Sequence, residues 1–221
     1  MIKYWFHFAL VVAAAAEIAS QVFGFSMLHI VAKPLLLIFL AAYYWQSVPS
    51  VNKTFFSALA FCWAGDVFLL LDHLHAIYFM AGLGSFLIAH VLFIFVYRQL
   101  RLEGEVLSGP QRARFSFPAI LASSGLVTVL YPVLGDLKIP VMVYTLVLTL
   151  MVVQSIFRFG RTSSKSFWLV FFGAASFMVS DALLSINKFH PPLSNAGVLV
   201  MGTYIAAVYM IVQGVIAHSE D

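Results

Sequence analysis

Long apolar runs, separated by short polar links, occupy almost the whole chain. Each run holds about 18 to 24 residues, enough for one helix to cross a hydrocarbon core of about 30 Å. The runs cover residues 4 to 23, 28 to 47, 54 to 72, 76 to 98, 115 to 132, 138 to 158, 166 to 187 and 194 to 217. Because they are continuously apolar rather than alternating, they favour helices over the strands of a β-barrel. The pattern predicts an all-α integral membrane protein with eight transmembrane helices in a single domain, residues 1–221.

The composition supports this class. Hydrophobic residues make up 62% of the 221 residues and charged residues only 10%, and the mean hydropathy is +0.99. A soluble domain carries about 25% charged residues, so the composition excludes that class. The first run also has features of a secretory signal peptide, but its length, the internal Glu17 and the seven runs behind it favour a retained helix.

Lysine and arginine predict the orientation in the membrane. With eight spans, both termini and the links at 48–53, 98–114 and 159–165 share one side. That side carries Lys3, Lys53, Arg98, Arg101, Arg112, Arg114, Arg158, Arg161 and Lys165. The opposite side carries only Lys138 and Lys188. Since basic residues concentrate in cytoplasmic links, we expect both termini in the cytoplasm. The net charge of +3 then reflects topology and predicts no nucleic-acid partner.

Two aspartates lie inside otherwise apolar runs, Asp66 in FCWAGDVFLLL and Asp181 in ASFMVSDALLS. A carboxylate at membrane depth costs at least about 2.5 kcal/mol unless it is paired, hydrogen-bonded or neutralised. Such residues usually face the protein interior and serve a function. We therefore take Asp66 and Asp181 as candidate catalytic residues, with a structural role as the alternative.

The two aspartates also suggest an internal repeat. The polar link at 98–114 separates two sets of four helices, and an offset of 115 positions aligns Asp66 with Asp181 and His75 with His190. A parallel 4+4 repeat, with halves 1–108 and 109–221, would bring the aspartates together near a pseudo-twofold axis along the membrane normal. The alternative is that a biased composition alone produces the matches.

Polar residues inside the runs form a layer. Five of them lie about six residues from the predicted outer ends of their helices, a depth of about 9 Å at 1.5 Å per residue. They are Glu17, Lys33, Asp66, Tyr144 and Asp181. Tyr204 lies slightly deeper, as does His90 if its helix begins near Gly82, and Asn187 is a further candidate lining residue. We interpret the layer as the floor of a substrate pocket that opens outward or to lipid.

Several of these residues also have a structural interpretation. Glu17 and Lys33 lie at similar depths on a tight hairpin, where they could neutralise one another as an ion pair. His90 could be an interhelical hydrogen-bond partner, and Asp72 lies at a helix end where it is solvated. The sequence leaves open whether Glu17 and Lys33 form a structural pair or contact substrate.

Four sequence strings carry a resemblance to a known family: AKPLL in the second run, AGDVFLLL, GLGSFLIAHVLF and VSDALLSINKF. In this order and spacing they resemble the YhhN/TMEM86 family of eight-helix membrane proteins, the lysoplasmalogenases. One departure concerns the last run, where the family has a Gln soon after the tyrosine. Here Ala207 and Val208 follow Tyr204 and the first Gln is Gln213, which puts a role for that Gln in doubt.

The resemblance implies hydrolysis of the vinyl ether bond of a lysoplasmalogen, giving a fatty aldehyde and a glycerophospho-ethanolamine or -choline. Vinyl ethers hydrolyse by protonation of a carbon, which produces an oxocarbenium ion that water captures. Pairs of carboxyl groups handle a similar cation in glycosidases. One of Asp66 and Asp181 would donate the proton and the other would stabilise the cation or activate water, with the assignment left open. We expect no metal and no organic cofactor, and the single Cys62 offers no thiolate metal site.

Other function classes stay open at this point. A proton-coupled transporter would also place paired carboxylates between repeats, and a structural protein would need them only to hold helices together. The expected partners are a lysophospholipid and the bilayer, and the expected location is a membrane, the inner membrane if the source is bacterial. Head-group preference, chain length and oligomeric state are not readable from the sequence.

Overall fold

The computed structural model describes residues 2–104, 106–191 and 193–219. Over these residues every regular element is helical. The elements are α1 (Ile2–Phe23), α2 (Ser26–Ser47), α3 (Lys53–Leu70), α4 (Ala76–Gln99), α5 (Gly109–Leu130), the short 3-10 helices η1 (Tyr131–Val133) and η2 (Gly135–Leu137), α6 (Lys138–Ile156), α7 (Ser164–Phe189) and α8 (Ala196–Ser219). Eight of them are long and apolar enough to cross a membrane. The eight predicted helices are confirmed, whereas the repeat and the orientation stay predictions.

α5 begins before its predicted start at residue 115. The side chain of Ser108 accepts a hydrogen bond from the backbone N–H of Gln111, and the Gln111 side chain accepts one from the Ser108 N–H, at 2.9 Å. This capping box satisfies two N–H groups that a helix start leaves unpaired. The helix therefore extends into the polar link, and Arg112 and Arg114 lie in its first turns.

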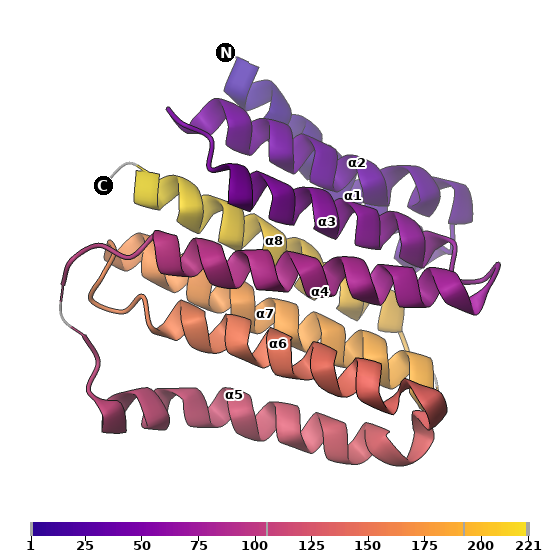
Figure 1. Ribbon diagram of the computed structural model, residues 1–221. Helices are drawn as coiled ribbons and strands as arrows, with labels where there is room; N and C mark the ends of the chain where they lie inside the picture. Colours follow the sequence, from indigo (N-terminus) through magenta and orange to yellow (C-terminus); the bar gives the residue numbers. More distant parts are fainter. Residues whose placement is uncertain (1, 105, 192, 220–221) are drawn as a thin grey trace. The chain divides into compact units, whose positions relative to one another are not determined.

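The chain forms two compact units, Met1–Phe93 and Ile94–Asp221, so the boundary falls inside α4. In the first unit, α1 packs against α2 and α2 against α3 (Figure 1). α4 approaches α3 closely where Gly65 faces Phe86, since a Cβ atom at Gly65 would lie 2.6 Å from the Phe86 ring. Small residues allow helices to approach in this way.

In the second unit, α5, α6 and α7 lie side by side and α7 packs along α8 (Figure 1). Two glycines make the close contact of α7 with α8. A Cβ atom at Gly173 would lie 2.9 Å from the carbonyl oxygen of Ala207, and one at Gly214 would lie 3.0 Å from the backbone nitrogen of Val170. This packing holds α7, which carries Asp181, firmly against its neighbour.

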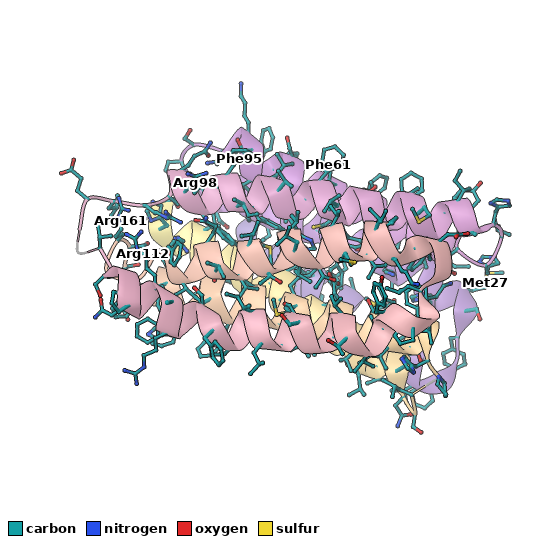
Figure 2. The ribbon with its side chains drawn as sticks, turned by 60° about the horizontal axis from the view of Figure 1, so that its bottom comes forward. Met27, Phe61, Phe95, Arg98, Arg112 and Arg161 are labelled. Carbon is teal, nitrogen blue, oxygen red and sulfur yellow. The ribbon has the colours of Figure 1, made fainter. Side chains whose placement is uncertain are left out.

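Arginine side chains gather at one end of the second unit, where Figure 2 shows Arg98, Arg112 and Arg161. Arg101 lies among them. Burial, together with the charges of Arg161, Arg98 and Arg112, lowers the pKa of Arg101 to about 10. Arg101 is thus still cationic at neutral pH, and this end of the unit carries a concentrated positive charge.

Candidate functional site

In the first unit, Asp66 forms an ion pair with Lys33. Asp66 lies one turn before the end of α3 and is 1% exposed. The Nζ atom of Lys33, on α2, lies 3.6 Å from Asp66 Oδ1. An ammonium beside a buried carboxylate compensates much of the cost of removing both charges from water. The structure therefore brings together two residues of the predicted layer.

Glu17 has different partners from the one considered in the sequence analysis. It is completely buried on α1, and its Oε1 lies 2.8 Å from His29 Nδ1 and accepts a hydrogen bond from Gln21 Nε2 at 3.0 Å. The interpretation of Glu17 and Lys33 as an ion pair is therefore wrong, because Glu17 pairs with His29 and Lys33 pairs with Asp66. His29 and Lys33 lie one turn apart on α2, so the tight link to α1 places His29 beside Glu17 while Lys33 reaches Asp66.

His29 and Gln21 were missed in the sequence analysis. Gln21 follows Glu17 by four residues, and His29 precedes Lys33 by four. Residues four apart share one face of a helix, so this spacing could have identified both as neighbours of the polar layer. The position of His29 close to the link between α1 and α2 hid its role.

His90 lies completely buried in α4. The helix begins at Ala76 rather than near Gly82, so His90 lies about 21 Å from this helix end, well below the depth of the polar layer. It follows Phe86 by one turn, and the ring of Phe86 lies against Gly65, next to Asp66. His90 thus belongs to the interior of the first unit, on a helix that packs directly on α3. Its functional role stays a prediction.

In the second unit, the hydroxyl of Tyr144 on α6 donates a hydrogen bond to Asp181 Oδ2 on α7. Both residues are buried, with Asp181 9% and Tyr144 7% exposed. The neighbouring Ser180 donates a hydrogen bond to the carbonyl oxygen of Val200 at 3.0 Å, which fixes this turn of α7 against α8. The structure thus also brings together two predicted residues here.

Tyr204 and Asn187 lie on either side of this pair along the helices. The ring of Tyr204 meets that of Phe177, one turn before Asp181, edge-on with centroids 5.5 Å apart. Asn187 lies near the end of α7, where its Oδ1 accepts a hydrogen bond from the Leu193 N–H at 3.2 Å. Tyr204 is therefore a buried neighbour of the Asp181 region, whereas Asn187 orders the link between α7 and α8.

The helix ends refine the depth of the polar layer. Asp66 lies four residues before Leu70 and Asp181 eight residues before Phe189, whereas Lys33 lies seven residues after Ser26. At 1.5 Å per residue these depths range from about 6 to 12 Å. The layer is thus broader than the common depth of about 9 Å that the sequence predicts.

The arrangement can perform acid and base chemistry. Each unit holds a buried carboxyl group whose orientation is fixed by a partner on a neighbouring helix, as proton transfer requires. Among the described residues, no group of three or more His, Cys, Asp or Glu side chains is placed to hold a metal ion. The pairs described above bring together carboxyl, phenol, imidazole and ammonium groups.

Eight helices that are long and apolar enough to cross a membrane, with carboxyl groups buried among them, define the class of a multi-pass membrane protein. The chain belongs to the YhhN family, whose model matches residues 28–215, a range that includes both aspartates and Lys33. Its relatives include proteins named lysoplasmalogenase from Mycobacterium bovis and Mycobacterium tuberculosis. Each is 31% identical over 140 residues, which cover 62% of this chain and 50% of the relative. The chain thus spans about half the length of these relatives, and the comparison with solved structures gave no significant match.

Proposed function

We propose that this protein is a lysoplasmalogenase, a membrane hydrolase that cleaves the vinyl ether bond of lysoplasmalogens. The observation that carries the proposal is its membership of the YhhN family, with relatives of that name, in a chain that holds two buried carboxyl groups inside apolar helices. The products are a fatty aldehyde and glycerophospho-ethanolamine or glycerophospho-choline.

The reaction needs one proton donor and one carboxylate. A carboxylic acid protonates the vinyl carbon remote from the ether oxygen, and an oxocarbenium ion forms. Water adds to this cation and gives up a proton to a carboxylate. The resulting hemiacetal then breaks its bond to the glycerol oxygen, which leaves as an alcohol, and the aldehyde is released. One water molecule is consumed and the total number of protons on the protein is unchanged.

The different partners of the two aspartates support a division of these roles. Asp66 is paired with the ammonium of Lys33, so we assign it the carboxylate role beside the cation and the attacking water. Asp181 accepts a hydrogen bond from the neutral hydroxyl of Tyr144, and we assign it the role of proton donor. The proposal thus predicts that both aspartates are essential, for different reasons.

The direct test is incubation of the purified protein with a lysoplasmalogen in D2O. We expect release of a fatty aldehyde with one deuterium on its α-carbon, because the carbon is protonated from a carboxyl group that exchanges with solvent. Alkyl-ether and ester lysolipids of the same chain length should not be cleaved, since the first has no double bond to protonate. Aldehyde without deuterium at that carbon, after correction for later exchange, would contradict carbon protonation.

We also propose that both termini are cytoplasmic. The excess of basic residues on that side and the arginine cluster of the second unit support this orientation. Single cysteines introduced at Glu103 and His73, in a Cys62→Ser background, provide a matched pair because both positions are exposed in links. We expect an impermeant reagent to label the His73 position in intact cells and to spare the Glu103 position, and the opposite result would reverse the topology.

A further inference from the structure

An apolar groove of about 440 Å³ lies between α2 and α3 of the first unit. Its floor contains Leu37 and Leu59, each 1% exposed, and its sides contain Trp45 and Trp63, which are 58% and 39% exposed. The small side chain of Ala60 leaves the hollow open. This volume is within the range of about 300 to 1,000 Å³ that is usual for small-ligand sites.

One end of the groove lies about one helical turn from the Lys33–Asp66 ion pair. Leu37 follows Lys33 by one turn of α2, and Trp63 precedes Asp66 by three residues of α3. From there the groove runs along both helices to Trp45, near the end of α2 at Ser47. Among the described residues that line it, the groove carries no charged side chain, and the buried ion pair lies beyond one end of it. This order of a charged pair followed by an apolar groove matches a molecule with a polar head and an apolar chain.

The dimensions fit a single hydrocarbon chain. Lys33 and Trp45 are twelve residues apart, which corresponds to about 18 Å along a helix. An extended chain that advances roughly 1.3 Å per methylene would need roughly fourteen methylenes to cover this distance. In the other direction, Asp66 lies four residues before the end of α3, or about 6 Å, so a glycerophosphate bound beside it reaches the polar boundary of the membrane.

We propose that this groove binds the single alkenyl chain of the substrate, with the vinyl ether beside Asp66 and the head group beyond it. The inference rests on the proposed function and adds the position of the chain and a preference for chains of about sixteen to eighteen carbons. Only two adjacent helices line the groove, so a second acyl chain finds no place in it.

The variant Ala60→Phe tests the groove, because residue 60 is exposed and lies six residues before Asp66, or about 9 Å along α3. A phenyl ring there should block the groove to long chains and leave space for short ones. We expect KM for a sixteen-carbon lysoplasmalogen to rise at least tenfold, with kcat and the KM for a six-carbon analogue nearly unchanged. The matched control is Ala15→Phe on α1, also at an exposed alanine but outside the groove. Equal effects of A60F on long and short substrates would overturn the inference.

A binding experiment separates the groove from the catalytic proposal. The probe is an uncleavable sixteen-carbon alkyl-ether lysolipid with a diazirine at the chain terminus. We expect photolabelling near Trp45 and Phe56, reduced at least tenfold in A60F and unchanged in A15F. If the protein cleaves lysoplasmalogens but the probe labels other helices, the proposed groove is overturned and the proposed function stands. If the probe labels the groove but lysoplasmalogens are not cleaved, the proposed function is overturned and lipid binding in the groove stands. Equal labelling by a diacyl lipid with the same diazirine shows a general bilayer contact and also overturns the inference.

Discussion

The two buried aspartates both lie inside apolar helices but have different partners. Asp66, in the first unit, forms an ion pair with Lys33, whereas Asp181, in the second, accepts a hydrogen bond from the hydroxyl of Tyr144. The partners come from corresponding helices, the second of each set of four, yet at the offset of 115 positions the counterpart of Lys33 is Leu148. Matching positions in two halves of a sequence therefore do not imply matching chemistry.

The residue before the aspartate also differs between the two units. Gly65 has no side chain and admits the ring of Phe86, whereas Ser180 uses its hydroxyl to bind the carbonyl oxygen of Val200. The first aspartate is held by close apolar packing and a charge, and the second by neutral hydrogen bonds. This contrast is what the following experiments test.

The largest effect is expected from Asp66→Asn and Asp181→Asn, made separately. Each substitution keeps the side-chain volume and removes acid and base chemistry, so kcat should fall by about 10² to 10⁴, the range for a positioned proton-transfer group. The measurement is aldehyde release by protein that elutes as a single species in detergent. Asp72→Asn is the control, because Asp72 lies beyond the end of α3, and it should stay near the wild-type rate. Wild-type rates in either of the first two variants would exclude that aspartate from catalysis.

Replacing the partner of each aspartate, rather than the aspartate itself, should change the stability of the protein to different extents in the two units. Lys33→Met leaves the Asp66 carboxylate buried beside an apolar side chain, which typically destabilises by about 3 to 5 kcal/mol. Tyr144→Phe removes one hydrogen bond inside the membrane, worth about 0.6 kcal/mol on average. The transition temperature of thermal unfolding in detergent should therefore decrease strongly in K33M and only slightly in Y144F.

The double variant K33M/D66N checks the origin of this difference. It has no buried charge at either position, so it should be more stable than K33M alone, as a double-mutant cycle would reveal. Equal stability of K33M and the double variant would mean that the ion pair is not what K33M disturbs.

Packing at the first aspartate should respond to one added methyl group. A Cβ atom at Gly65 would lie 2.6 Å from the Phe86 ring, whereas one at Gly84 would meet nothing within 4 Å. Gly65→Ala should therefore destabilise the protein by about 1 to 3 kcal/mol through overpacking, and Gly84→Ala should be neutral or slightly stabilising because alanine favours helix. Thermal unfolding of the two variants provides the comparison, and equal transition temperatures would argue against close packing of α3 on α4.

The smallest effect on activity is expected at Ser180, with an effect on stability as small as that of Tyr144→Phe. Ser180→Ala removes the hydrogen bond to Val200 and should cost about 0.6 kcal/mol, with aldehyde release nearly unchanged. Ser57→Ala, at an exposed position of α3, is the control for the same chemical change. A loss of activity in S180A as large as in D181N would show that the hydroxyl takes part in the reaction rather than in helix packing.

Local sequence signals account for most of the fold. The eight helices were predictable because the hydropathy of a membrane span is summed over about 20 residues. A single polar residue such as Asp66 hardly changes this sum. The early start of α5 was also encoded locally, in Ser108 and Gln111, but the charges that follow made this segment resemble a link. Family membership was predictable from four short strings around the polar residues.

The sequence by itself determined the eight apolar helices, the family and the carboxyl groups at membrane depth. Only the tertiary structure decided the partners of those groups: His29 and Gln21 for Glu17, Lys33 for Asp66, and Tyr144 for Asp181. The physical reason is geometric. Each residue along a helix advances about 1.5 Å and turns by about 100°, so small differences in helix rotation and packing decide which of two polar residues one turn apart meets a given carboxylate.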